Sequence, residues 1–187
     1  MSWRSNDFRQ VLQSFDKLEA GGWFMKGATK TAPPVAKKPD VDLSAVNNRI
    51  FFRLFQLGNT LQRQAVKELG ISTVQWAVLG ALSRTQAEDG MSFAELSDYL
   101  VVSRQNLDGV LKRLERDSHV VRLPDASDRR ARLIKLTPQG RRLWTTLQPK
   151  IYEFYRQAMV QFRFDDSIAF VHYLNKLQAD LVEVKLP

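Results

Sequence analysis

The stretch VVSRQNLDGVLKRLERDSHVVRLPDASDRRARLIKLTPQG, residues 101–140, decides the fold of this chain. Its first part has Ser103, a residue type that caps helix N-termini, followed by apolar residues at helical spacing: Leu107, Val110, Leu111 and Leu114. Two apolar-rich runs, 120–123 and 132–136, then flank a polar loop, which is typical of a β-hairpin with a long tip. The stretch therefore predicts a short amphipathic helix followed at once by a hairpin.

Two more short helices are predicted immediately before this stretch. One begins at Thr73, which we expect as its N-cap, and is almost wholly apolar through Leu82. The other follows Ser92, and Glu95 three residues later completes a capping box. Three short helices followed by a hairpin make a winged helix-turn-helix. The predicted fold class is therefore mainly α with a small β-hairpin wing.

Long helices with apolar stripes are predicted on both sides of the winged helix-turn-helix. The pattern over 43–69 is broadly apolar on one face and ends at Gly70, a residue suited to a helix C-cap. Thr137 is expected to cap the helix that follows the hairpin, and apolar stripes continue over 143–159 and 168–181. The stripes over 143–159 and 168–181 are too apolar to be left in water and need a partner, so we interpret these helices as dimerisation helices.

The predicted domain organisation has four parts. They are an N-terminal amphipathic helical extension at 1–25, a proline-containing linker at 26–42, dimerisation helices at 43–69 and 143–187, and the winged helix-turn-helix DNA-binding domain at 70–142. The extension carries both aromatic and arginine side chains near its start, namely Trp3, Arg4, Phe8 and Arg9. Binding of a protein partner and binding of DNA both remain open for it.

Charge and composition favour an anionic partner. The net charge is +8, and residues 103–142 contribute six of those charges, with 11 basic and 5 acidic side chains. A basic surface beside a helix and a hairpin favours DNA phosphates as its partner. The chain has no cysteine, no apolar leader and no apolar run long enough for a membrane span, which predicts a cytoplasmic, nucleoid-associated protein with no membrane partner.

The first turn of the helix after Ser103 carries the side chains expected to read DNA. A helix fits the major groove, where arginine pairs with guanine and asparagine or glutamine pairs with adenine. Arg104, Gln105 and Asn106 have the required chemistry. Ser103 and Lys112 complete the predicted recognition-helix set, with Lys112 expected to contact the DNA backbone.

Three segments of the chain resemble the MarR family of bacterial transcription regulators. They are STVQWAVLGAL, FAELSDYLVVSRQNLDGVLKRLERD and VVRLPDASDRRARLIKLTPQGRRL, of which the Asp-Arg-Arg wing followed by "LT..G" is the most diagnostic. Ser118 departs from the glycine usual before the first wing strand, and His119 from an aliphatic residue. A single left-handed position tolerates serine at modest cost. The resemblance implies a homodimer that reads a pseudo-palindromic DNA operator, with a repressor as the expected outcome.

The resemblance also gives the wing arginines separate roles. One arginine of the Asp128-Arg129-Arg130 set is implied to enter the narrow minor groove, where the negative potential is enhanced. We assign that role to Arg129 and assign Arg130 to a brace with Asp125 or Asp128. Arg132 already lies on the predicted strand and is expected to meet a phosphate or solvent.

Members of the family commonly release DNA when a small aromatic acid binds between the dimerisation helices and the winged domain. By this resemblance, we predict an aromatic acid or its acyl thioester as the effector and an aromatic-catabolism operon as the target. The residues expected to bind it are Arg49, Phe51, Phe52, Arg53, Phe55 and Trp76. Their aromatic rings would stack on the effector and an arginine would clamp its carboxylate.

Other functional classes have less support in the sequence. The only two histidines, His119 and His172, lie far apart, and no glycine-rich phosphate loop or catalytic triad pattern is present, so no enzyme is expected. Two histidines without cysteine also make a poor ligand set, so neither a metal nor a cofactor is expected. The alternative that remains open is a constitutive DNA-binding regulator or architectural protein without an effector.

Overall fold

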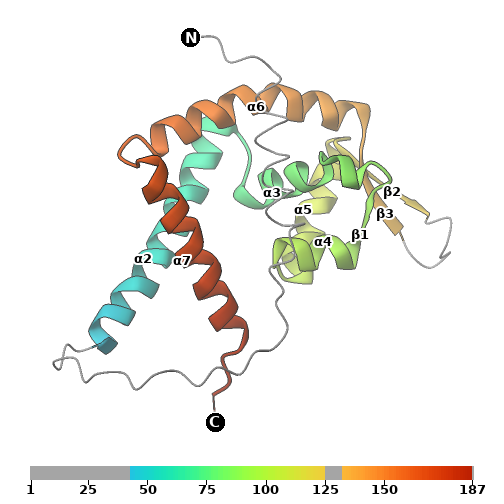
Figure 1. Ribbon diagram of the computed structural model, residues 1–187. Helices are drawn as coiled ribbons and strands as arrows, with labels where there is room; N and C mark the ends of the chain where they lie inside the picture. The colour runs from blue at the N-terminus through green and yellow to red at the C-terminus, as the bar shows by residue number, and fades with distance from the viewer. Residues whose placement is uncertain (1–42, 125–131, 187) are drawn as a thin grey trace. The chain divides into compact units, whose positions relative to one another are not determined.

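The computed structural model describes residues 43–124 and 132–186 (Figure 1). In chain order the elements are α2 (Leu43–Gln64), a π-helical turn (Ala65–Leu69), α3 (Thr73–Leu82), a 3₁₀ turn (Thr85–Ala87), β1 (Met91–Ser92), α4 (Phe93–Leu100), α5 (Arg104–Arg116), β2 (Val120–Pro124), β3 (Arg132–Leu136), α6 (Pro138–Ala158) and α7 (Phe164–Val182). The predicted extension at 1–25 and linker at 26–42 lie outside the described residues. The mainly α winged helix-turn-helix class is confirmed.

The core lies in the winged helix-turn-helix, between α3, α4, α5 and the sheet. Its largest fully buried side chains are Val78, Leu79, Leu82, Leu96, Leu107, Leu111, Leu114 and Ile134. The inward face predicted for α5 is confirmed, because all four of its apolar positions are buried. The polar residues of α5 are thereby left on its outer side.

The wing is part of a three-stranded antiparallel sheet with the order β1-β3-β2. Val120 pairs with Leu136 at the base of the hairpin, and Pro124 pairs with Arg132 at the last described rung. The short strand β1 pairs with the other edge of β3, with Met91 opposite Ile134. The two predicted strands are therefore present, and a third was missed because two residues are too few to show an alternating pattern.

Side-chain caps begin the helices of the winged domain. The predicted capping box of α4 is present, with the Glu95 N–H donating to Ser92 Oγ and the Ser92 N–H donating to the Glu95 carboxylate. Thr137 also caps α6 as predicted. The N-cap predicted at Thr73 is wrong: Ser72 caps α3 in a capping box with Gln75. Thr73 is instead the first helical residue.

Three non-helical backbone positions shape the connections. Gly70 ends the π-helical turn in the left-handed region, with φ of 74°, which confirms it as a C-cap. Ser118, before the first wing strand, has φ of 58°, so serine takes the place of the usual glycine as expected. Val101, between α4 and α5, has φ of 51°, which is a strained conformation for a β-branched residue.

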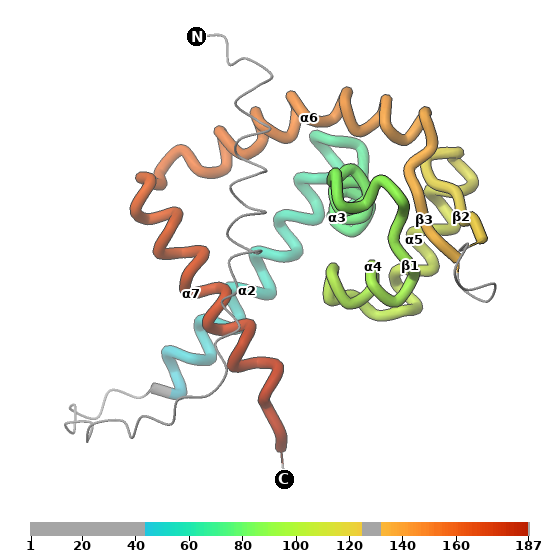
Figure 2. Tube along the Cα trace, turned by 45° about the vertical axis from the view of Figure 1, so that its right-hand side comes forward, coloured from blue at the N-terminus to red at the C-terminus, as the bar shows by residue number. Residues whose placement is uncertain are grey.

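The long helix α6 runs along the winged domain, and α2 and α7 lie together toward the far end of α6 (Figures 1 and 2). Trp76 of α3 packs against α6, stacking on Tyr155 and meeting Phe154 edge-on, each with ring centroids 5.7 Å apart. After α6, α7 turns back toward α2 and has no buried residue. Within the described ranges, none of the helices is long and apolar enough to span a membrane.

Candidate nucleic-acid interface

The first turn of α5 presents the residues predicted to read DNA. Arg104, Gln105 and Asn106 are all exposed. Ser103 Oγ accepts a hydrogen bond from the Asn106 N–H at 3.3 Å, so its hydroxyl serves as the helix cap. The cap fixes where the helix starts and therefore where the three side chains leave it. The role of each of these residues in DNA binding stays a prediction.

A pocket with three arginines lies beside this turn. Its volume is about 460 Å³, and it is lined by Ser92, Phe93, Ala94, Arg104, Arg122, Arg132 and Ile134. The pocket therefore joins the start of α4, the start of α5 and the wing strands. It brings together Arg104 and Arg132, which were predicted for DNA contact from separate elements. Among the described residues, neither of these two arginines has an ion-pair partner.

Arg122, the third arginine, was not predicted as a site residue. Its Nη2 donates to Asp108 Oδ1 at 3.2 Å. Its buried Nε lies 3.1 Å from Glu115 Oε1, which is an ion pair without a hydrogen bond. Asp108 Oδ2 also lies 2.8 Å from Lys112 Nζ. Hydrogen bonds from Lys112 and Arg122 hold the pKa of Asp108 below its usual value, so this carboxylate is ionised at neutral pH.

The base of the wing is tied to the end of α5 through backbone carbonyl groups. The Thr137 hydroxyl donates to the Ser118 carbonyl at 2.6 Å, and the Thr137 N–H donates to the His119 carbonyl at 3.1 Å. Gln139 Nε2 donates to the Asp117 carbonyl at 3.2 Å. These contacts explain the threonine of the "LT..G" motif, because its side chain joins α5, the wing and α6.

The wing tip itself lies outside the described residues. This applies to Asp125, Asp128, Arg129 and Arg130, so their predicted groove and brace roles stay predictions. Arg132 is described as the first residue of β3, and it is exposed. The described strands end at the pair Pro124 and Arg132, from which the tip extends.

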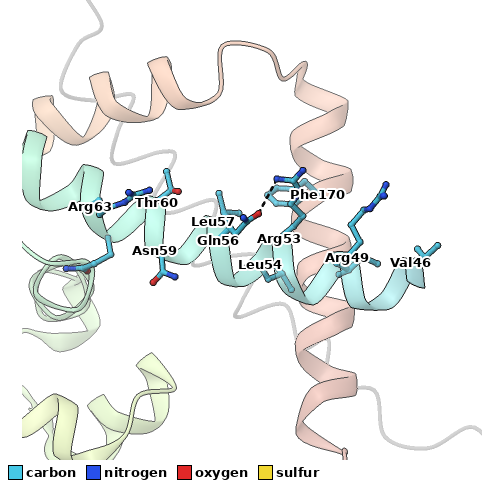
Figure 3. A pocket seen from close by; sticks show the side chains of 12 residues that line it. Val46, Arg49, Arg53, Leu54, Gln56, Leu57, Asn59, Thr60, Arg63 and Phe170 are labelled. Atoms are coloured by element: carbon cyan, nitrogen blue, oxygen red, sulfur yellow. Dashed lines mark hydrogen bonds between the residues drawn. The ribbon is translucent and has the colours of Figure 1, made fainter. Parts of the chain in front are cut away.

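The residues predicted to bind an effector fall into two groups. Arg49 and Arg53 line an open groove of about 1180 Å³ along α2, together with Phe170 of α7 (Figure 3). Arg53 Nη1 donates to Gln56 Oε1 at 3.1 Å in this groove. Its lining does not include Phe51, Phe52 or Phe55, which are exposed, nor Trp76, which packs against α6. The structure therefore does not gather the predicted arginines and aromatic rings into one pocket.

A capped helix with a polar face, beside an arginine-lined pocket and a β wing, defines a winged helix-turn-helix DNA-binding protein. Known proteins agree with this class. The MarR family model matches residues 69–131. The transcriptional activatory protein BadR of Rhodopseudomonas palustris is 48% identical over 134 residues, which cover 70% of this chain and 77% of that protein. The chain belongs to the MarR family of transcription regulators, and it is a DNA-binding regulator.

Two further relatives agree with this family. The homoprotocatechuate degradative operon repressor of Escherichia coli is 32% identical, with 63% of this chain and 77% of that protein covered. The crystal structure of the PcaV transcriptional regulator from Streptomyces coelicolor, in complex with its natural ligand, matches with a TM-score of 0.63. It is 26% identical and covers 78% of this chain and 100% of that one. One of these relatives is thus named an activator of transcription and another a repressor.

Proposed function

We propose that this protein is a ligand-responsive, sequence-specific regulator that binds a pseudo-palindromic operator as a homodimer. The observation that carries the DNA-reading part is the exposed first turn of α5, with Arg104, Gln105 and Asn106 beside the arginine-lined pocket. Side chains at this end of a helix reach base edges when the helix enters the major groove. Arg132, which is exposed and lines the same pocket, adds a contact to the DNA backbone.

The apolar surface of the long helices supports the homodimer. On α2 alone the exposed large apolar side chains are Val46, Ile50, Phe51, Phe52, Phe55, Leu57 and Leu61. A further set lies on α7, including Ile168, Val171 and Leu174. A monomer rarely leaves such an area in water, so a second copy is the proposed cover. In that dimer, two recognition helices address major grooves one turn of duplex apart, about 34–36 Å.

Substitution of single cations on α5 tests the DNA-reading roles. Arg104→Ala should cost about 1–3 kcal/mol on the operator and relax specificity at one base pair, since a bidentate base contact is lost. Lys112→Ala should weaken binding on every sequence and flatten the dependence of affinity on salt, since a phosphate contact is lost. Fluorescence anisotropy on operators selected from random duplexes measures both. A uniform loss across sequences for Arg104→Ala would assign Arg104 to the backbone instead.

The effector is proposed to be a small aromatic acid or its acyl thioester. Two guanidinium groups, those of Arg49 and Arg53, face the groove along α2 and suit a carboxylate. The E. coli relative is named for homoprotocatechuate degradation, and this supports control of an aromatic-catabolism operon here. The ligand acts only through a difference in its affinity for the DNA-bound and free arrangements of the two winged domains.

A gel-shift titration decides between an inducible and a constitutive regulator. Benzoate, 4-hydroxybenzoate and their coenzyme A thioesters are added to the complex of the full-length protein with a selected operator. Release at ligand concentrations that leave non-specific complexes intact supports the proposal. If no acid or thioester weakens operator binding, the constitutive regulator stands. A promoter fusion then measures whether the protein represses or activates transcription, and repression is the proposed outcome.

A further inference from the structure

Asp108 is an acidic side chain on the helix assigned to DNA reading, and two cations hold it. Its Oδ2 lies 2.8 Å from Nζ of Lys112, one turn later on α5. Its Oδ1 accepts a hydrogen bond from Arg122 Nη2 on β2 at 3.2 Å. A carboxylate at this place repels DNA phosphates and engages groups that would otherwise attract them. Its presence on a basic DNA-binding surface therefore calls for a physical reason.

Asp108 has different effects on its two cationic partners, Lys112 and Arg122. The Lys112 side chain is 72% exposed, so it can leave Asp108 for a phosphate, but only by giving up this contact. The Arg122 side chain is 29% exposed and is also held by Glu115, so it stays between helix and strand. Asp108 thus competes for one cation and fixes the other, joining α5 to the wing strand β2.

We propose that Asp108 is a positioning residue that determines specificity, because it weakens non-specific DNA binding more than operator binding. The inference rests on the proposed function, sequence-specific reading by α5. Non-specific binding depends almost wholly on the number of free cations near phosphates, so each cation that Asp108 engages lowers it. Operator binding needs in addition a fixed relation of α5 to the wing, and the bridge through Arg122 provides it.

The test is Asp108→Asn in the full-length protein, with affinities measured on a selected operator and on a random duplex over a range of salt concentrations. On random DNA, affinity should rise about threefold or more. The slope of log affinity against log salt should steepen by less than about 0.9, the value for one whole phosphate contact, because in the wild type Lys112 is shared between Asp108 and phosphates. On the operator the gain should be absent, because the bridge that positions α5 is weakened, so the ratio of operator to random affinity should fall by about threefold or more.

Asp117→Asn is the matched control. Asp117 lies at the other end of α5, pairs with Arg116 at 3.0 Å, and has a side chain 40% exposed against 36% for Asp108. The control removes the same charge, and the affinity ratio should stay near that of the wild type. Asp108→Glu should restore the ratio, because glutamate also pairs with lysine one turn later. Adding Lys112→Gln to Asp108→Asn should return random-DNA affinity toward the wild-type value.

Arg122→Lys tests the bridge without changing α5. Lysine keeps the charge but cannot reach both carboxylates as a guanidinium does, so the ratio should fall while random-DNA affinity stays the same. This variant decides the matter if Asp108→Asn unfolds at the assay temperature. The inference is overturned if the wild type prefers its operator and both variants keep the wild-type ratio of operator to random affinity. It is also overturned if their ratio equals that of Asp117→Asn. A wild type without sequence preference would overturn the proposed function as well.

Discussion

Gly140 is the residue at which the fold leaves the least room for a side chain. A Cβ atom built there lies 1.9 Å from the carbonyl oxygen of His119 and 2.9 Å from its carbonyl carbon. Those are backbone atoms at the start of the wing, and the Thr137 N–H already donates to the same carbonyl. Because backbone cannot rotate away as a side chain can, only glycine allows α6 to begin this close to the wing. This accounts for the last residue of the "LT..G" motif.

Gly140→Ala should therefore lower the free energy of unfolding by about 3 kcal/mol, at the upper end of the cost of overpacking. Urea unfolding followed by circular dichroism measures the change. Gly109→Ala is the control, because its Cβ would meet only the end of the Arg113 side chain, at 3.9 Å. Alanine is the better helix former, so this control should gain up to about 1 kcal/mol. Equal stability of the two variants would contradict the close approach at Gly140.

Residues whose role depends on near neighbours in sequence were predictable. The caps at Ser92, Ser103 and Thr137 follow from residue type and spacing, and all three are present. The error at Thr73 is one residue, because Ser72 and Thr73 are both good caps and only Gln75 favours the serine. Arg122 could not be predicted, because its two carboxylate partners meet it only when β2 packs beside α5.

At the scale of elements, a side chain on α2 controls the start of α3. Gln62 Oε1 accepts hydrogen bonds from both the N–H and the hydroxyl of Thr73, at 2.9 and 2.6 Å. The link crosses the π-helical turn Ala65–Leu69 and the left-handed Gly70. It therefore fixes the angle at which α2 meets the winged domain. Gln62 also lines the groove along α2, so a group bound in that groove has direct access to the link.

Gln62→Ala should destabilise the protein by about 1–3 kcal/mol, since it leaves two donors at the start of α3 without their partner. Gln62→Glu keeps the acceptor and should retain most of the stability. Gln64→Ala, two residues later, replaces an exposed glutamine that makes no cap contact, and it should stay within about 0.5 kcal/mol of the wild type. Chemical unfolding of the three variants gives the comparison. A loss of the same size at Gln64 would mean that the link carries no stability of its own.

Whether an element could be predicted from the sequence depends on the length of the pattern that defines it. Helices of eight or more residues were predicted, because a period near 3.6 repeats often enough to be seen. The π-helical turn was read as a plain continuation of α2, since one wide turn does not change the apolar pattern over 43–69. Strand β1 was missed because its identity comes from pairing with β3, a contact between residues about 40 positions apart.

At the scale of the whole molecule, the apolar faces of α2 and α7 are the surfaces that the proposed homodimer buries. Phe55 is 66% exposed on α2, and Phe51 and Phe52 beside it are about half exposed. The sequence predicted these stripes as buried against a partner, but it also placed three of the phenylalanines in an effector site. Both assignments use the same side chains. Only an experiment on assembly separates them, because a side chain packed between two copies is not free to stack on a ligand.

Phe55→Glu should convert the proposed dimer to monomer, because it places an unpaired charge in the proposed interface. Sedimentation velocity from micromolar to nanomolar protein should give the wild type twice the chain mass of 21.5 kDa and the variant that mass once. Leu123→Glu, the same kind of change at an exposed position of β2, should remain a dimer. The monomer should lose affinity for both the operator and random duplex, because the two winged domains no longer bind together and about half of the phosphate contacts are lost. A variant that stays dimeric would remove Phe55 from the interface and leave its ring free for the effector.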